Sequence, residues 1–285
     1  MNSYPQLQEA YKRACEIELQ AFKPGNVSIY SAAHDMTVDD FIASAIASAP
    51  ALCNPDYSLG EKIYYAVQAT RQAVTCNTNL GIILLSAPLM QAFMQRKPDQ
   101  SLRQSLAEVL SHTTRQDCDW VYKAITLAAP GGLGKSEQQD VSESPQVNLL
   151  EAMKIASPKD RIAWQYCNEF KDIFDFTVFE YNRAFVLSGD FGWSALVVFA
   201  ELLARYPDSH IERKFGSEHS EWIASQMSLL CQQLKIRSFS ELMPFLHDLD
   251  CVFKAKRINP GTTADLVVAT LLTVFLEQLI SNNHC

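Results

Sequence analysis

The sequence predicts an all-α fold, a single-domain bundle of about ten helices with one or more helices buried at its centre. Three observations lead to this expectation. Helix breakers are scarce, because only 10 Gly and 12 Pro occur among 285 residues, which is below the usual share of about 12%. Apolar residues recur at steps of three and four in most segments. Two segments, Gly81 to Met90 and Leu266 to Leu276, are apolar on nearly all sides, as is typical of helices surrounded by other helices.

The helical spacing sets out the elements in order along the chain. Segments with one apolar face begin near residues 41, 59 and 102. Further helices are expected over the ranges 4–21, 80–94, 116–129, 159–188, 192–206, 219–235, 238–255 and 263–281. The best strand-like pattern, Phe176 to Phe179, lies in a helical context. The polar segment 135–148 is expected to be a mobile loop within one domain that comprises residues 1–285.

Charge and composition exclude several classes of protein. The 24 Lys and Arg against 32 Asp and Glu give a net charge of −8, so nucleic acid is not an expected partner. The N-terminus has no signal-peptide pattern, and the apolar run from Leu266 to Leu276 is too short to span a bilayer. We therefore expect a cytoplasmic protein without a membrane partner, and a homo-oligomer remains open. The eight cysteines lack zinc-site spacing and are expected to be reduced thiols packed in helices.

The first cluster of chemically interesting residues extends from Lys23 to Phe41. It offers a cation, a glycine for close approach, hydrogen-bonding groups and carboxylates that could bind Mg²⁺. Its candidate site residues are Lys23, Gly25, Asn26, Ser28, His34, Asp35, Asp39 and Asp40. An equally weighted alternative is that Thr37 or Asp39 only caps the helix that follows.

Two further clusters contain polar residues or glycines. In the segment Cys76 to Gly81, a single helix cap explains one polar residue but not Asn77, Thr78 and Asn79 together. The glycines Gly131, Gly132 and Gly134 form a cluster that matches neither a P-loop nor a dinucleotide fingerprint. This glycine cluster is weak support for ligand contact.

The last two clusters combine basic residues with helix starts. If Asp208 or Ser209 caps a helix, His210 and Lys214 lie on one face of it beside Arg213. This basic patch either binds phosphate or is an ordinary solvent-exposed helix face. The segment from Asn259 to Asp265 has free N–H groups and the hydroxyls of Thr262 and Thr263 at the start of the last helix. Asp265 is either a residue favoured by the helix dipole or a metal ligand.

These motifs occur in one order over nearly the full length: KPGNVS, HDM followed by DDF, NTNLG, PGGLG, Asp160-Arg161, DSHIERKFG and NPGTTADL. Together they resemble the triphosphoribosyl-dephospho-CoA synthase family. These are all-helical transferases that make the prosthetic-group precursor of citrate lyase and malonate decarboxylase. The resemblance implies that ATP loses adenine at its ribose anomeric carbon, and that the ribose 2′-hydroxyl of 3′-dephospho-CoA captures this carbon.

The resemblance also implies roles for the candidate residues, with ATP and a phosphorylated acceptor as small-molecule partners. Asp35 and Asp265 would bind Mg²⁺, with Asp39 or Asp40 as a further carboxylate. Either His210 or Asp208 would be the general base. The remaining residues would bind substrate: Lys23, Arg213 and Lys214 at phosphates, Asn77, Asn79, Gly131, Gly132 and Gly134 around the nucleotide, and Gly25, Asn26, Ser28, His34, Arg161, Asn259, Thr262 and Thr263 at other contacts.

Three alternatives accompany this interpretation. His34 is followed directly by Asp35, whereas members of the citrate-lyase type tend to have one residue between them, in the pattern His-x-Asp-Met. The KPGNV segment with this arrangement instead resembles a second branch, which is linked to tetrahydromethanopterin and one-carbon metabolism. In that branch a pterin-type or other phosphorylated acceptor would replace dephospho-CoA. The doublets His34-Asp35 and His247-Asp248 also admit a His-Asp metal phosphohydrolase, and a non-catalytic nucleotide-binding protein is a further alternative.

Overall fold

The computed structural model describes residues 4–31, 36–129 and 144–282. Within these ranges the chain forms α-helices and one π-helical turn, and the only β-type pairing is an isolated bridge between Ser28 and Ser31. The predicted all-α class is therefore confirmed. The first seven helices are α1 (Tyr4–Gln20), α2 (Val38–Leu52), α3 (Leu59–Ala73), α4 (Leu80–Gln95), α5 (Leu102–Ser111), α6 (Arg115–Ala128) and α7 (Leu149–Ala156).

The second half of the chain is divided more finely than predicted. Its elements are α8 (Arg161–Cys167), η1 (Ile173–Thr177), α9 (Val178–Ser188), α10 (Phe191–Arg205), α11 (Ser209–Phe215), α12 (Ser220–Leu234), α13 (Phe239–Ala255) and α14 (Gly261–Asn282). The expected single helix over 159–188 is wrong, because Glu169 and Phe170 adopt positive φ angles of 51° and 54° that no helix accommodates. The strand-like residues Phe176 to Phe179 are helical, as their context indicated.

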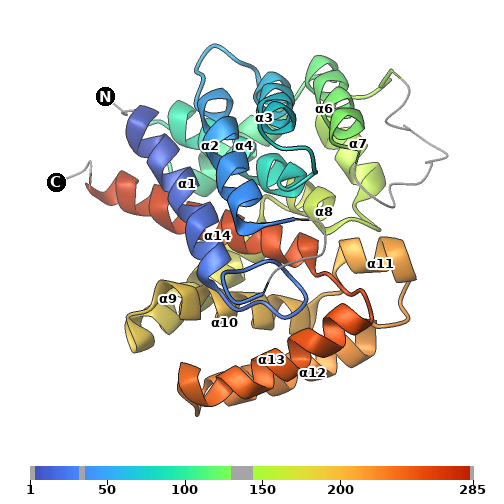
Figure 1. Ribbon diagram of the computed structural model, residues 1–285. Helices are drawn as coiled ribbons and strands as arrows, with labels where there is room; N and C mark the ends of the chain where they lie inside the picture. Colours follow the sequence, from blue (N-terminus) through green and yellow to red (C-terminus); the bar gives the residue numbers. More distant parts are fainter. Residues whose placement is uncertain (1–3, 32–35, 130–143, 283–285) are drawn as a thin grey trace.

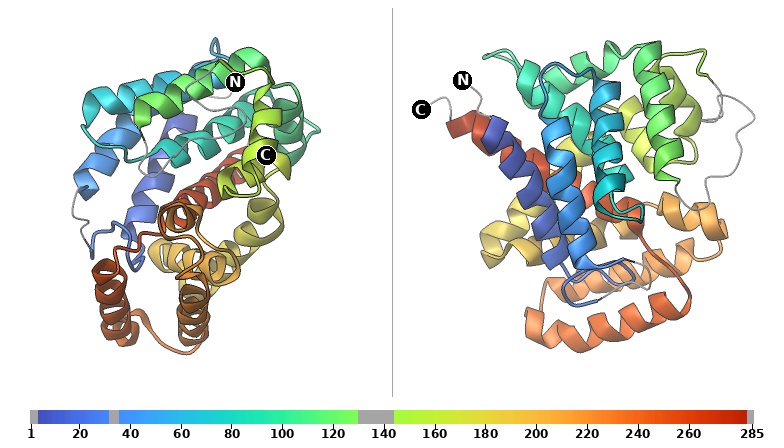
Figure 2. Two further views of the ribbon diagram at one scale, coloured as in Figure 1. Left: turned by 90° about the vertical axis from the view of Figure 1, so that its right-hand side faces the viewer. Right: turned by 45° about the horizontal axis from the view of Figure 1, so that its top comes forward.

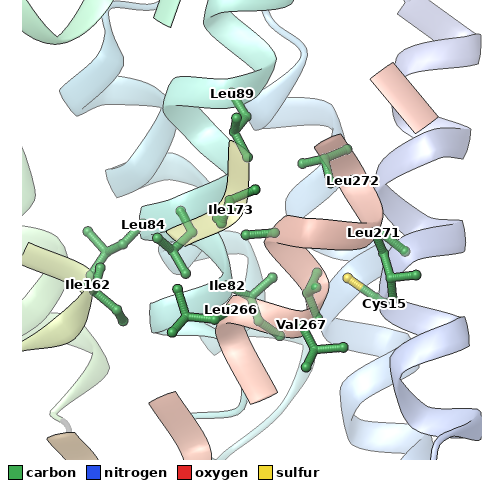
Figure 3. Close-up of a cluster of buried hydrophobic side chains, with 14 of the residues drawn as sticks. Cys15, Ile82, Leu84, Leu89, Ile162, Ile173, Leu266, Val267, Leu271 and Leu272 are labelled. Carbon is green, nitrogen blue, oxygen red and sulfur yellow. The ribbon is translucent and has the colours of Figure 1, made fainter. Parts of the chain in front are cut away.

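The apolar helices α4 and α14 form the centre of the bundle, which confirms the predicted buried helices. α14 contacts α1, α4, α8, α9, α10 and α11, and it passes through the middle of the molecule in Figure 1. Figure 3 shows Ile82, Leu84, Ile162 and Leu266 from α4, α8 and α14 directed toward one another. This packing holds the start of α14 beside the starts of α4 and α8.

The length of α14 corrects the expectation that the last apolar segment is too short to span a bilayer. Its 22 residues are long and apolar enough to cross a membrane, whereas the run from Leu266 to Leu276 alone is too short. Of its most apolar window, 67% is buried within the bundle. A core helix passes the same test of length and composition, and the surrounding helices account for this apolar surface.

The starts of the helices are fixed by local side chains. Thr37 caps α2, with its hydroxyl accepting from the N–H of Asp40 while the Asp40 carboxylate accepts from the Thr37 backbone, so the predicted cap is confirmed. Asp160 and Asp208 cap α8 and α11, each through a carboxylate oxygen that accepts from two N–H groups of the first turn. α12 and α13 lie at one end of the molecule in both views of Figure 2. The seven described cysteines are free thiols, as expected.

Candidate functional site

Four segments that are distant in sequence meet at the first turn of α14. A Cβ atom placed on Gly81 would lie 2.0 Å from Oδ2 of Asp265, so the α4 backbone borders that carboxylate. The His210 ring lies 3.6 Å from a Cβ placed on Gly261. Asn26 donates from its amide to Oδ1 of Asn259 at 2.8 Å. The predicted clusters around residues 23, 77, 208 and 259 therefore share one region of the molecule.

Asp265 is the least satisfied carboxylate of this region. It is half-buried in the first turns of α14, and no other described residue forms a hydrogen bond with it. Burial raises the pKa of Asp265 well above its usual range, and repulsion from Asp208, Glu18 and Asp160 raises it further, against the opposing effect of Arg213. A cation at this carboxylate would relieve both costs.

Asp208 joins two helix starts. Its Oδ1 accepts from the N–H groups of His210 and Ile211, and its Oδ2 accepts from the N–H and hydroxyl of Thr263 at 2.7 and 2.8 Å. The side chain is buried. Both carboxylate oxygens of Asp208 thus hold α11 against α14. Of the two candidates for the general base, His210 is therefore favoured over Asp208.

His210 has the properties of a proton acceptor. It is half-buried, and its ring forms no hydrogen bond with any part of the chain that the structure describes. Burial lowers the pKa of His210, and the positive charges of Arg213 and Lys214 lower it further, although Asp208 opposes them. A neutral imidazole at neutral pH can take a proton from a hydroxyl group.

Two basic residues of α11 supply positive charge beside His210. Arg213 donates to Oδ2 of Asp160 at 2.7 Å and remains partly exposed. Lys214 is exposed, and its ammonium makes a long 3.4 Å contact with the carbonyl of Arg257 and lies 5.0 Å from the centre of the Phe215 ring. Lys214 is therefore free to meet an anionic ligand, while Arg213 is held near the site by Asp160.

Lys23 is placed differently from the prediction that it binds phosphate. Its side chain is 0% exposed, and its ammonium contacts the Glu18 carboxylate at 2.9 Å and the carbonyls of Glu18 and Val27 at 2.8 Å. These three acceptors use all three ammonium protons. Lys23 therefore stabilises the turn after α1 and has no donor left for substrate.

Arg161 is likewise engaged within the protein. Its guanidinium forms a two-point ion pair with Asp172 at 2.8 Å and lies between the rings of Trp164 and Tyr206. This arrangement locks the side chain in place. The predicted substrate contact of Arg161 is therefore replaced by a structural role, with its backbone N–H donating to the hydroxyl of Ser209.

The turn that contains Gly25, Asn26 and Ser28 is built to pack against α13. Gly25 has a φ of 80°, and a Cβ there would lie 2.7 Å from the carbonyl oxygen of Ile258, so only glycine fits. The N–H of Gly25 donates to Asp250 at 2.8 Å, and Ser28 is buried with its hydroxyl accepting from the Tyr30 N–H. These contacts orient Asn26 toward Asn259.

The acidic residues at the start of α2 are explained without a metal. Asp40 accepts from the N–H and the hydroxyl of Thr37, which lowers its pKa. Asp39 is exposed on the same turn. Asp40 thus serves as a cap through one carboxylate oxygen, its assignment as a metal ligand stays a prediction, and no described contact links Asp39 to Asp265.

The residues before α4 form a buried polar chain. Ser44 and Thr78 share a hydrogen bond at 2.5 Å, and the Asn79 amide lies 3.5 Å from the Ser48 hydroxyl, which in turn contacts Tyr11. Asn79 makes no side-chain cap to α4. Asn77 is half-buried. The N–H groups of the first turn of α4, beside Asp265, are therefore left without a side-chain cap.

Several candidate residues lie outside the described ranges: His34, Asp35, Gly131, Gly132 and Gly134. Most of the expected loop at 135–148 lies there as well. Within the described ranges, no group of three or more His, Cys, Asp or Glu side chains is arranged to hold a metal ion. Of the two His-Asp doublets, His247-Asp248 lies within the described ranges. His247 is exposed on α13, and its ring packs edge-on against Phe22.

Three neighbours of Asp265 were not assigned to the site from the sequence. Gly81 provides the space for the carboxylate, while Glu18 and Asp160 contribute to its electrostatic environment. The NTNLG and Asp160-Arg161 motifs pointed to two of them. Glu18 lies in an ordinary amphipathic helix, and no sequence signal distinguishes it.

The fold and the site define an all-helical protein in which helix N-termini, a carboxylate with no hydrogen-bond partner among the described residues and an imidazole of lowered pKa lie in one region. Over residues 5–284 the chain matches the CitG family, described as ATP:dephospho-CoA triphosphoribosyl transferase. The chain belongs to this family. The family resemblance drawn from the motifs is confirmed, whereas the link of KPGNV to a second branch stays a prediction.

Two relatives illustrate the match. The chain is 34% identical over 83 residues to a Citrobacter koseri protein named "Probable 2-(5''-triphosphoribosyl)-3'-dephosphocoenzyme-A synthase", a match that spans 29% of this chain and 26% of that protein. It also shares its fold with a crystal structure described as "putative triphosphoribosyl-dephospho-coA synthase from Archaeoglobus fulgidus". That similarity has a TM-score of 0.64 at 23% identity and covers 83% of this chain and 98% of the other.

Proposed function

We propose that the protein transfers the triphosphoribosyl group of ATP to the ribose 2′-hydroxyl of 3′-dephospho-CoA. The bond between C1′ and the adenine nitrogen breaks, and a bond forms between C1′ and the acceptor oxygen. Adenine leaves with the bonding electrons and gains a proton, while the hydroxyl loses one. The half-buried carboxylate of Asp265 beside Gly81, which has no hydrogen-bond partner among the described residues, is the observation that carries this proposal, together with the family match.

Asp265 also fits a divalent cation. Mg²⁺ is usually held by one or two carboxylates together with substrate phosphates and water, so a single unpaired carboxylate suffices on the protein side. When bound, Mg²⁺ would supply positive charge that neutralises the polyphosphate. Asp265 would hold it, with Asp35 as the second ligand that the family resemblance implies.

The other residues of the site act on the substrates directly. Lys214 and Arg213 bind phosphate oxygens through charge-assisted hydrogen bonds. His210 accepts the proton of the attacking hydroxyl, because its lowered pKa keeps the imidazole neutral. The carboxylates around Asp265 favour the positive charge that develops at C1′ as adenine departs.

Mass spectrometry tests the reaction. The full-length protein is incubated with ATP, Mg²⁺ and dephospho-CoA, and free adenine and the coupled product are measured. An Asp248→Asn variant, which changes an exposed carboxylate of α13, should behave as the wild type. Adenine release only with a pterin-type acceptor would point to the one-carbon branch, and ATP binding without adenine release under any condition would indicate a non-catalytic binding protein.

A further inference from the structure

A second cavity lies away from Asp265, among α9, α10, α12 and the start of α13. Its volume is about 680 Å³, within the range of about 300–1,000 Å³ that small-molecule sites occupy. Gln20 at the end of α1 and Tyr30 of the following loop complete its wall. A cavity of this size, open to solvent, can take a substantial part of a ligand.

The walls of this cavity combine aromatic and aliphatic surface. The rings of Tyr30 and Phe239 lie 5.5 Å apart, and those of Trp193 and Phe239 lie 6.2 Å apart. Ala184 lies on the α9 side, and Leu187 at the rim is 79% exposed. The apolar rim and the aromatic wall favour a ligand with methyl and methylene groups.

The charges that line the cavity are balanced rather than basic. Arg183 is already paired with Glu180 at 3.0 Å, and two carboxylates, those of Asp190 and Glu201, also line the cavity. Lys235 is the one cation of the lining without an ion pair to a described residue. The lining therefore offers no net positive charge to a triphosphate, whereas the amide of Gln20 suits an uncharged polar ligand.

One loop has residues at both the cavity and the transfer site. Asn26 of this loop bonds to Asn259 beside the transfer site, while Tyr30 of the same loop lines the cavity and stacks on Phe22 at 5.4 Å. At the end of α1, Glu18 acts on Asp265 and Gln20 lines the cavity. The end of α1 and the loop after it therefore connect the wall of the cavity to the surroundings of Asp265.

We infer that the cavity binds the pantetheine arm of the acceptor, an inference that rests on the proposed function. Pantetheine is uncharged, and its dimethyl carbon, hydroxyl, two amides and terminal thiol match the mixture of aromatic, aliphatic and amide groups in the wall. In dephospho-CoA the arm is attached through the diphosphate, on the side of the ribose away from the reacting hydroxyl. ATP has no such arm, so the cavity distinguishes acceptor from donor.

Filling the cavity tests this inference. Ala184→Trp places a large ring in it, and Val186→Trp, two residues along α9 at a site that is 84% exposed, is the matched control. Calorimetric titration of the full-length protein with dephospho-CoA and with pantetheine should show affinity reduced at least about tenfold in Ala184→Trp alone. ATP affinity should be unchanged in both variants.

The opposite results are equally clear. Wild-type affinity for dephospho-CoA in a folded Ala184→Trp protein would overturn the inference even if adenine release continues. If Ala184→Trp does not fold, Leu187→Glu at the exposed rim decides the question by the same titrations, and unchanged affinity again overturns it. If the wild type neither binds dephospho-CoA nor releases adenine with it, the proposed function fails and the inference with it.

Discussion

Gly81 of α4 leaves the space that the carboxylate of Asp265 on α14 occupies, with a substituted Cβ lying 2.0 Å from Oδ2. No side chain at position 81 is compatible with this placement of Asp265. The two residues are 184 positions apart in the sequence, yet their contact defines where α4 and α14 meet. The contact therefore ties the geometry of the proposed site directly to the packing of the core.

Gly81→Ala should displace Asp265 and impair adenine release. The added methyl group also meets Ile162 at 2.9 Å, and such overpacking costs about 1–3 kcal/mol, measured by denaturant unfolding. In an Asp265→Ala background the same change should cost less, because the carboxylate is gone. An equal loss of stability in both backgrounds would show that Asp265 is not the group displaced.

Asp265→Asn should stabilise the protein while removing its function. The carboxylate is half-buried and without a hydrogen-bond partner among the described residues, so replacing the charge should raise the free energy of unfolding by about 1 kcal/mol or more at pH 8. Differential scanning calorimetry measures the change. A large fall in stability would instead make Asp265 a structural residue of α14.

The stabilisation by Asp265→Asn should depend on pH. Because the folded pKa of Asp265 is raised by burial and by neighbouring carboxylates, the native state holds this proton to a higher pH than the unfolded chain. The wild type therefore loses stability as pH rises from the unfolded pKa of about 3.9 through the folded pKa. The difference in Tm between the variant and the wild type should be smallest near about pH 4 and grow toward about pH 8, and a constant difference contradicts this assignment.

Lys23 and Lys214 should respond to substitution in opposite ways. Lys23→Met leaves the Glu18 carboxylate buried without its partner, which costs about 3–5 kcal/mol, and Glu18→Gln in the same chain should restore part of the loss. Lys214→Ala should change stability by less than about 0.5 kcal/mol but weaken ATP binding. Calorimetric titration and thermal unfolding of both variants separate the two roles, and unchanged ATP affinity in Lys214→Ala removes Lys214 from the site.

His210 and Asp208 can be separated in the same manner. Asp208→Asn replaces an acceptor of four hydrogen bonds, so it should lower stability by about 1.5–3 kcal/mol. His210→Gln should leave the melting temperature nearly unchanged and lower kcat by about 10²-fold or more. If Asp208→Asn instead retains full stability and loses turnover, Asp208 is the base.

The sequence predicted those features that depend on local pattern. The all-round apolar composition of α4 and α14 predicted their burial, and the caps Thr37 and Asp208 followed from residue types beside a helical face. The break in the predicted helix over 159–188 was missed, because Glu169 and Phe170 do not favour the left-handed conformation that they adopt.

The site was predictable as a set of segments but not as a set of contacts. Lysine and arginine are usually exposed, so nothing in the sequence marked Lys23 and Arg161 as side chains that Glu18 and Asp172 hold. Which residue approaches Asp265 depends on how α4 packs against α14. That packing requires the folded core, and no spacing along the chain encodes it.

Adenine release by the wild type and by Asp265→Asn, measured with ATP, Mg²⁺ and dephospho-CoA, tests the central claim most directly. We expect stoichiometric adenine and coupled product from the wild type, and none above background from the variant, which should remain folded and at least as heat-stable. Wild-type rates in Asp265→Asn would contradict the claim, because the carboxylate beside Gly81 would then have no part in the transfer.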